Sequence, residues 1–269
     1  MLRIARVATL KECAALEPLQ REVWSGHLVL AAPHMFASIT CGGILVGAYD
    51  GAQPVGFCYG FPARKRWNVW LHSHMLAVLP AYRGQDLGFQ LKVAQRQAAL
   101  EDEYSVVSWT FDPLQYVNAR LNLARLGAVG TAYLVDYYGP MEDPLNRGLP
   151  TDRILLEWSI ASPAVAERIA RSSAGPEPVG LPVINRVAAE RTGGLACATP
   201  DLSLTHPEVL MRIPTEFAAL RNRDPGLARE WRLKTRQAFS HYLGTGYRAV
   251  DLFPGRETCA YLLEKGRSG

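Results

Sequence analysis

Hydrophobic and polar positions along the chain switch between two periods, and the switches mark out an α/β protein. Alternating or continuous apolar runs predict strands, whereas apolar positions three or four residues apart predict helices. Strands are expected at 2–7, 44–49, 55–61, 67–79, 105–111, 129–138, 154–160, 209–213, 247–253 and 258–263. Helices are expected at 9–19, 86–101, 114–126 and 215–243, the last one broken near Pro225.

Short local motifs support three of these predictions. Thr9, followed three residues later by Glu12, has the spacing of a capping box. The pair Asp50-Gly51 predicts a hairpin, and Gly127 suits the left-handed residue after a helix. Ser, Gly and Pro are dense between residues 171 and 182, which predicts a linker or loop.

The composition restricts the function classes. With 269 residues, 48% of them hydrophobic, the chain can form one large or two smaller domains. A net charge of +4, with no Lys/Arg cluster interleaved with aromatics, suits an anionic small molecule and argues against nucleic acid. The sequence shows no signal peptide or membrane span, and its five cysteines form no CxxC pair, so a reduced cytoplasmic location is expected.

The most informative segment is residues 76–92, LAVLPAYRGQDLGFQLK. An apolar run ends at Pro80, a basic turn containing glycine follows, and a helical pattern begins directly after it. A strand, a turn with free N–H groups and a helix N-terminus together favour binding of a diphosphate. The residues expected to hold it are Arg83, Gly84, Gln85, Asp86, Leu87 and Gly88.

This segment resembles the central motif of the GNAT family of acyl-CoA-dependent N-acyltransferases, roughly V-x-P-x-Y-R-G-x-G-x-G. The residues in register are Val78, Pro80, Tyr82, Arg83, Gly84 and Gly88. A second segment, from Asn118 to Gly127, resembles the later N-x₈-G segment of the family, and Asn118 is expected at the cofactor. The resemblance implies a mixed, mostly antiparallel sheet flanked by helices (α/β, α+β), with a core at 1–160 and an α/β extension at 161–269.

One position departs from the motif. The middle glycine of the family is Asp86 here, a residue type that tolerates left-handed dihedrals better than most, although its charge opposes a dianionic ligand. Alternatively, Asp86 is the N-cap of its helix. Further along that helix, Lys92 is expected in solvent, with a phosphate contact as the alternative.

The strand before the turn carries two histidines. With period two, His72, His74, Leu76 and Val78 share one face. The resemblance implies that the backbone at Leu76, Ala77 and Val78 holds the pantetheine arm, and that His74 removes the proton from the amine. His72 is expected at the substrate; the alternatives are His72 as the base, a metal site without an evident third ligand, or structural histidines.

The general acid is sought among the tyrosines. The family often has a tyrosine four residues before the glycine that matches Gly127, and Leu123 stands there. Tyr133, Tyr137 and Tyr138 are the later candidates, of which Tyr138 is preferred. A coenzyme A thiolate is a good leaving group, so the reaction can also proceed without an acid.

Further polar residues are candidates for the acceptor site. Asp112 and Asp152 could pair with an ammonium and Arg153 with a carboxylate, whereas a salt-bridged turn is the alternative. A basic stripe on the helix near the C-terminus is expected to face solvent, with a coenzyme A phosphate or a partner as the alternative. It consists of Arg229, Arg232 and Arg236.

Longer segments, among them HSHMLAVLPAYRG, WTFDPLQYVNARLN and NRGLPTDR, resemble one predicted-acetyltransferase branch of the GNAT family. Members of this branch are found with N-acylamino-acid racemases. The resemblance implies acyl transfer from acetyl-CoA or succinyl-CoA to a primary amine of a small amino acid. The alternatives are a non-catalytic acyl-CoA-binding regulator and a self-associating module, and a homodimer is compatible with each.

Overall fold

The computed structural model describes residues 2–24, 29–141, 148–171, 175–189 and 194–266. The chain forms two compact units, residues 1–109 with 158–166 and residues 110–157 with 167–269. It passes between them within strands β5 (Val106–Phe111) and β7 (Arg153–Ser159) and within helix α6 (Pro163–Arg171). The division therefore differs from the predicted boundary at residue 160, because these three elements each contribute to both units.

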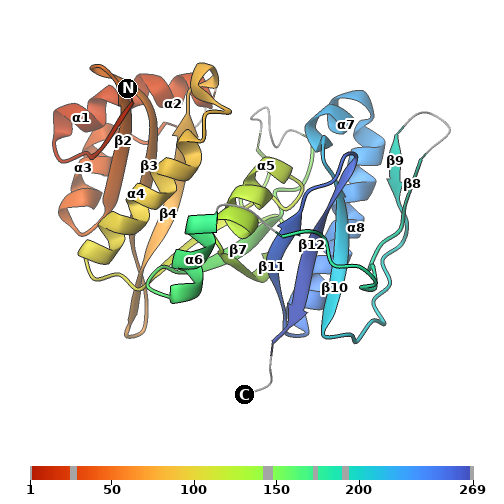
Figure 1. Ribbon diagram of the computed structural model, residues 1–269. Helices are drawn as coiled ribbons and strands as arrows, with labels where there is room; N and C mark the ends of the chain where they lie inside the picture. Colours follow the sequence, from red (N-terminus) through yellow and green to blue (C-terminus); the bar gives the residue numbers. More distant parts are fainter. Residues whose placement is uncertain (1, 25–28, 142–147, 172–174, 190–193, 267–269) are drawn as a thin grey trace. The chain divides into compact units, whose positions relative to one another are not determined.

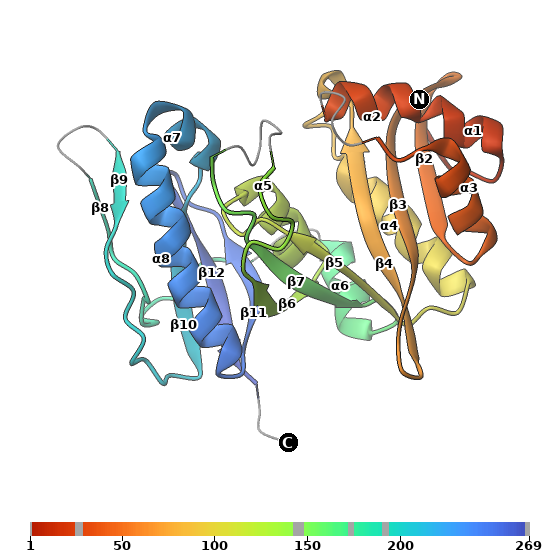
Figure 2. The ribbon, with the colours of Figure 1, turned by 180° about the vertical axis from the view of Figure 1, so that it is seen from behind.

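The first unit is a sheet with helices on both faces. Its strands run in the order β1 (Arg3–Arg6), β2 (Ile44–Asp50), β3 (Gln53–Lys65), β4 (Asn68–Val78) and β5, antiparallel except between β4 and β5. Helix α4 (Leu87–Glu101) covers one face. The other face carries α1 (Leu10–Ala15), α2 (Glu17–Val23) and α3 (Ala32–Thr40), as Figure 1 and Figure 2 show from opposite sides.

Local hydrogen bonds explain where the first elements begin and turn. The capping box is present, because Thr9 Oγ1 accepts from the Glu12 N–H and Glu12 Oε2 accepts from the Thr9 N–H. The hairpin at Asp50-Gly51 is also confirmed, since Asp50 pairs with Gln53 and Gly51 has a φ of 57°. The predicted mixed, mostly antiparallel sheet flanked by helices is thus confirmed.

The second unit is an antiparallel sheet covered by a long helix. Its strands follow the order β7, β6 (Val129–Leu134), β11 (Tyr247–Phe253), β12 (Thr258–Lys265) and β10 (Glu208–Pro214). Helix α8 (Pro225–Gly244) lies behind these strands in Figure 1 and in front of them in Figure 2. Helix α7 (Phe217–Arg223) precedes α8, and β8 (Val187–Ala189) with β9 (Leu195–Cys197) forms a separate ribbon.

The predicted long helix is broken at Pro225, as expected. Asp224 stands between α7 and α8, and its Oδ1 accepts from the Leu227 N–H at 2.9 Å. Proline at the first position of α8 has no N–H to lose there, so it starts the helix without cost.

Two predictions in the second unit need correction. The helix expected at 114–126 is a short α5 (Tyr116–Ala119) followed by a π-helical segment η2 (Arg120–Arg125), although Gly127 closes it with a φ of 69° as expected. The strand expected at 129–138 stops at Leu134, so Tyr138 lies in a turn and not in a strand. Asp136 has a φ of 48° in this turn, a conformation that ends the ladder.

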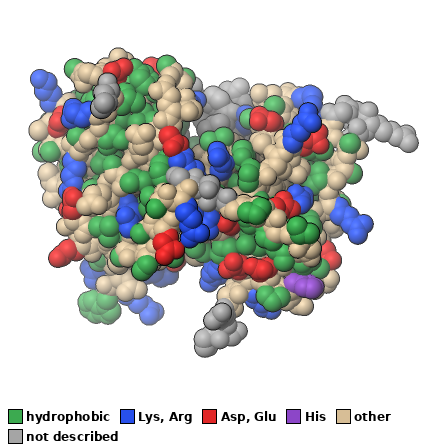
Figure 3. Space-filling model, viewed as in Figure 1, with side chains coloured by type: hydrophobic (Ala, Val, Ile, Leu, Met, Phe, Trp, Pro, Cys, Tyr) green, Lys and Arg blue, Asp and Glu red, His purple; other side chains and the backbone are tan. Residues whose placement is uncertain are grey.

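The surface and the buried thiols agree with the composition. On the face seen in Figure 3, basic and acidic side chains are interspersed and form no broad field of one sign. The cysteines are all unpaired, and four of them are buried as small apolar residues. Among the described residues, no helix is long and apolar enough to cross a bilayer, and no cluster of three or more His, Cys, Asp or Glu could hold a metal ion.

Candidate functional site

Strand β4 contains a β-bulge at one of the predicted catalytic residues. Ser73 pairs with Gly60 and Met75 pairs with Tyr59, so His74 is an additional residue opposite the β3 ladder. A bulge bends its strand and leaves backbone groups outside the ladder, and such irregularities are frequent beside active sites.

The bulge changes which residues share a face. His72 pairs with Phe61 and Leu76 pairs with Cys58, and positions 58 and 61 point to opposite faces of β3. Leu76 and Val78 therefore face away from His72. The prediction that the histidines share a face with Leu76 and Val78 is wrong, because one inserted residue reverses the alternation.

The two imidazoles lie together on the face that carries α1 to α3. The Phe61 ring is 5.3 Å from His72 and 5.7 Å from His74, centroid to centroid. His72 Nδ1 lies 3.0 Å from Ser108 Oγ, which also accepts from Trp70 Nε1 at 2.8 Å. Ser108, which sequence reasoning missed, fixes the orientation of the His72 ring.

Both histidines have lowered pKa values, which favours the neutral imidazole. Burial, followed by the charges of His74 and Lys92, lowers the pKa of His72 to about 4. His74 has more of its surface in solvent, yet partial desolvation, followed by the charge of His34, lowers its pKa as well. A neutral imidazole can accept a proton from an amine, which is what the predicted role of His74 requires.

Strands β4 and β5 separate after a short parallel ladder. Their pairs are Leu71 with Val107 and His72 with Ser108, whereas β4 continues to Val78. Within the described residues, the β5-facing edge of β4 is thus open beyond His72. The predicted pantetheine positions, residues 76–78, lie on this open edge; their contact with a cofactor remains a prediction.

The turn after β4 keeps several N–H groups available. The N–H of Tyr82 is bonded to Leu79 O and that of Arg83 to Pro80 O. In the described part of the chain, no backbone carbonyl outside regular elements accepts from the N–H groups that follow. These are the N–H groups of Gly84, Gln85, Leu87 and Gly88. N–H groups in such a turn at a helix N-terminus can bind an anion, and their contact with a diphosphate stays a prediction.

The backbone of this turn contains two left-handed residues. Gly84 has a φ of 77°, and Asp86 has φ 65° and ψ 7°. Asp86 thus adopts the conformation that a glycine would supply at the middle position of the motif, and it is also the N-cap residue of α4. Arg83 Nε donates to Val78 O at 3.1 Å, which holds this guanidinium between the turn and the open edge of β4.

The position of Lys92 differs most from what the sequence predicted for the first unit. It was expected in solvent but is 2% exposed, and its Nζ donates to Ser73 Oγ at 3.0 Å and to Gln95 Oε1 at 2.8 Å. Burial lowers the pKa of Lys92 to about 8. The buried face of α4 thus includes the polar residues Lys92 and Gln95 beside apolar residues such as Leu91.

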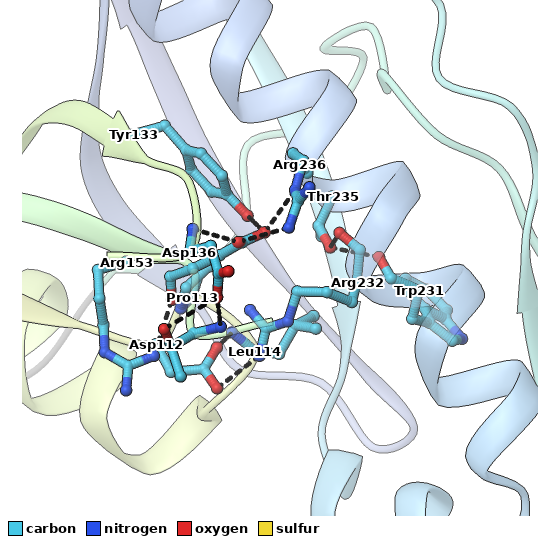
Figure 4. Close-up of polar contacts among 12 residues, drawn as sticks. Asp112, Pro113, Leu114, Tyr133, Asp136, Arg153, Trp231, Arg232, Thr235 and Arg236 are labelled. Atoms are coloured by element: carbon cyan, nitrogen blue, oxygen red, sulfur yellow. Dashed lines mark hydrogen bonds and ion pairs between the residues drawn. The ribbon is translucent and has the colours of Figure 1, made fainter. Parts of the chain in front are cut away.

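The predicted acceptor residues of the second unit lie in a buried ion-pair network, shown in Figure 4. Arg232 Nη2 donates to Asp112 Oδ2 at 2.6 Å, and Asp112 Oδ1 accepts from the Leu114 N–H at 2.9 Å. Burial alone would raise the pKa of Asp112, but the contacts with Arg232 and Leu114 outweigh it and lower this pKa.

The carboxylate of Asp152 is fully enclosed as well. Arg236 donates to both of its oxygens, at 2.9 and 2.8 Å. The Tyr133 hydroxyl and the Asp136 N–H donate to the same carboxylate at 2.8 and 3.0 Å. Both aspartates thus have internal partners, which favours the salt-bridged alternative over an ammonium contact.

The prediction that the basic stripe of α8 faces solvent is wrong for two of its three members. Arg229 is exposed, whereas Arg232 is buried and Arg236 is half-buried. Both are held by the ion pairs with Asp112 and Asp152. These two arginines therefore lie on the inner surface of α8, and their charges are neutralised by carboxylates from distant segments.

The other predicted residues of the second unit differ in exposure, since Arg153 is buried and Tyr138 is exposed. The Arg153 guanidinium stacks 5.2 Å from the Tyr138 ring, and the Tyr138 hydroxyl lies 3.3 Å from Thr110 Oγ1. Asn118 is exposed on α5, and Leu123 is fully buried. Their catalytic, substrate or cofactor roles stay predictions, and residues 146 and 147 of the segment NRGLPTDR lie outside the described residues.

Comparison with known proteins assigns the fold. Residues 13–127, somewhat less than half of the chain, match the model of the acetyltransferase (GNAT) family. No curated protein sequence matches the chain. This segment therefore carries the sequence signature of the GNAT acetyltransferases. It includes strands β2 to β5 of the sheet described above.

Two solved structures are similar to part of the chain at low identity. A candidate acetyltransferase from Acinetobacter baylyi ADP1 is 16% identical with a TM-score of 0.50, over 61% of this chain and 96% of that one. The ribosomal-protein-S18-alanine N-acetyltransferase from Escherichia coli is 13% identical with a TM-score of 0.48, over 60% and 96%. At such identities the likeness concerns the fold alone.

Proposed function

We propose that the protein transfers an acyl group from acyl-CoA to a primary amine by direct attack in a ternary complex. One observation carries the proposal: among the described residues, the N–H groups of Gly84, Gln85, Leu87 and Gly88 have no backbone acceptor outside regular elements, and this turn follows the open edge of β4. A diphosphate fits the first feature and an extended pantetheine arm fits the second. The match of residues 13–127 to the GNAT family supports the same donor.

The donor would be held by the backbone more than by side chains. The N–H groups of Gly84, Gln85, Leu87 and Gly88 would bind the diphosphate, and the terminal nitrogens of Arg83 would add charge-assisted hydrogen bonds. The backbone of residues 76–78 would hold the pantetheine. Acyl-CoA supplies an activated thioester whose carbonyl carbon is the electrophile.

The chemistry requires one proton acceptor and one polarising group. Neutral His74 would take the proton from the amine, directly or through a water, as the nitrogen attacks the thioester carbon. N–H groups at the open edge of β4 would stabilise the oxyanion. The C–S bond then breaks, and the coenzyme A thiolate leaves, with Tyr138 as the candidate donor of its proton.

The resemblance to a branch of the GNAT family suggests the identity of the acyl donor and of the amine that accepts the acyl group. Acetyl-CoA or succinyl-CoA as donor, and a small amino acid as acceptor, are supported by the resemblance to the branch found with N-acylamino-acid racemases. Arg153 is the candidate for the acceptor carboxylate, because its guanidinium is fixed by the Tyr138 ring and by Asp152 O at 2.9 Å.

A thiol-release assay tests the proposal directly. Acetyl-CoA and succinyl-CoA are each combined with a panel of amino acids and simple amines. We expect release with at least one pair, and H74A should lower kcat by about 10²- to 10⁴-fold while coenzyme A still binds. H241A, which removes a histidine of α8, is the matched control and should keep full activity.

A second candidate is a non-catalytic acyl-CoA-binding regulator. Two observations favour it: Leu123, at the position of the family tyrosine, is fully buried and cannot donate a proton, and Asp86 places a negative charge at the turn. Coenzyme A binding without thiol release in any pair would select this candidate over the transferase.

A further inference from the structure

The ammonium of Lys92 is buried in the first unit among neutral partners. Its two hydrogen-bond acceptors, Ser73 Oγ and Gln95 Oε1, carry no charge. None of the ion pairs found among the described residues includes Lys92. A charge in this position is costly to bury, so its retention calls for a functional reason.

Two indole rings form the wall of the Lys92 site. The Nζ atom lies 3.8 Å from the centroid of the Trp109 ring and 5.4 Å from that of Trp158. The rings meet edge to face, with centroids 5.8 Å apart. This aromatic environment favours the charged form through cation–π attraction while it excludes water.

The contact with Ser73 connects Lys92 to the bulge of β4. Ser73 is the last residue in register before His74, and it lies on the opposite face of the strand from His72. The ammonium is therefore anchored beneath the segment in which the strand bends and the two imidazoles stand.

Few other titratable groups face this ammonium. Cys58 of β3 is buried with its Sγ 3.7 Å from Ser73 Oγ, and His72 of β4 interacts with the Lys92 charge through the sheet. Arg6 of β1 faces the far end of α4, where it pairs with Asp102 at 3.0 Å. The charge of Lys92 therefore acts mainly on the β4 bulge.

We propose that Lys92 is a positioning residue for the acyl transfer. It fixes the β4 bulge through Ser73 and holds a positive charge on the opposite face of the sheet from His72. The charge disfavours protonation of His72 and favours the negative charge that develops on the thioester oxygen. This role rests on the proposed function.

The first test compares K92M with S73A and with K65M, an exposed lysine of β3 that serves as the control. K92M should lower kcat by about tenfold or more with little change in the KM for acyl-CoA. The wild type should lose activity as the pH rises through about 8, where Lys92 loses its proton, and K92M should lack this decline. S73A removes the contact between Lys92 and the β4 bulge, so it should lower kcat. Because this variant keeps the Lys92 charge, its activity should still decline as the pH rises through about 8.

A second measurement separates this role from the proposed function. Titration of the imidazoles by NMR needs no turnover, and the pKa of His72 should be higher in K92M than in the wild type by roughly half a unit or more. Equal His72 pKa values, or unchanged kcat and pH profile in K92M, would overturn the role of Lys92. Absence of thiol release from the wild type would instead overturn the transferase proposal, whatever the titration shows.

Discussion

Arg232 on α8 and Asp112 after β5 form a buried ion pair, 2.6 Å between Nη2 and Oδ2. The side chains are 2% and 8% exposed, so neither charge can be solvated if its partner is removed. Replacing Asp112 by Asn should therefore lower the free energy of unfolding by about 3–5 kcal/mol, as measured by urea denaturation.

The double variant D112N/R232M provides the control for this pair. It removes both charges at once, so it should be destabilised by clearly less than the sum of the two single variants. Additive effects would show that the two side chains do not stabilise each other.

The contact of Arg236 with Asp152 depends on geometry as well as charge. Arg236 donates through Nε and Nη2 to the two carboxylate oxygens, a pattern that lysine cannot form. R236K should lower the free energy of unfolding by about 1–3 kcal/mol. R229K, on the exposed side of the same helix, should change it by less than about 0.5 kcal/mol, and equal effects in both variants would contradict the geometric argument.

Burial of Lys92 makes stability depend on pH in the alkaline range. Its pKa is about 8 in the folded protein and 10.5 in the unfolded chain, so between these values the unfolded state holds a proton that the folded state has lost. Stability should thus rise with pH through this window, by at most about 3 kcal/mol. K92M should lack this rise when unfolding is measured from pH 7 to 10.5, and the same rise in both proteins would show that another group causes it.

Much of the fold could be predicted because the relevant signals are local. The capping box of Thr9 and Glu12, the hairpin at Asp50, the helix break at Pro225 and the left-handed Gly127 each depend on a few adjacent residues. The turn after Pro80 belongs to the same class, since its backbone conformation is set by its own sequence.

What could not be predicted depends on distant partners or on one inserted residue. Asp112 is 120 positions away from Arg232, and no helical periodicity shows which arginines will meet a carboxylate. Burial of Lys92 requires indoles from two other strands. The bulge at His74 reverses the alternation of β4 without any change in residue type, so the sequence pattern assigned the faces beyond it incorrectly.

Asp86 should limit the affinity for coenzyme A. Its left-handed backbone gives the turn its shape, while its carboxylate lies at the N-terminus of α4, where a diphosphate would bind. D86N keeps the side-chain shape and tolerance of this conformation but removes the charge, so coenzyme A should bind several-fold more tightly in calorimetric titrations. Unchanged or weaker binding would show that the carboxylate does not face the ligand.

The most direct test of the acyl-CoA site is the response of the turn amides to coenzyme A. In ¹H–¹⁵N spectra of the labelled protein, addition of coenzyme A should produce its largest shifts at Gly84, Gln85, Leu87 and Gly88. In the described ranges of the chain, no backbone carbonyl outside regular elements accepts from their N–H groups. Saturating coenzyme A that leaves these amide signals unchanged would contradict the account.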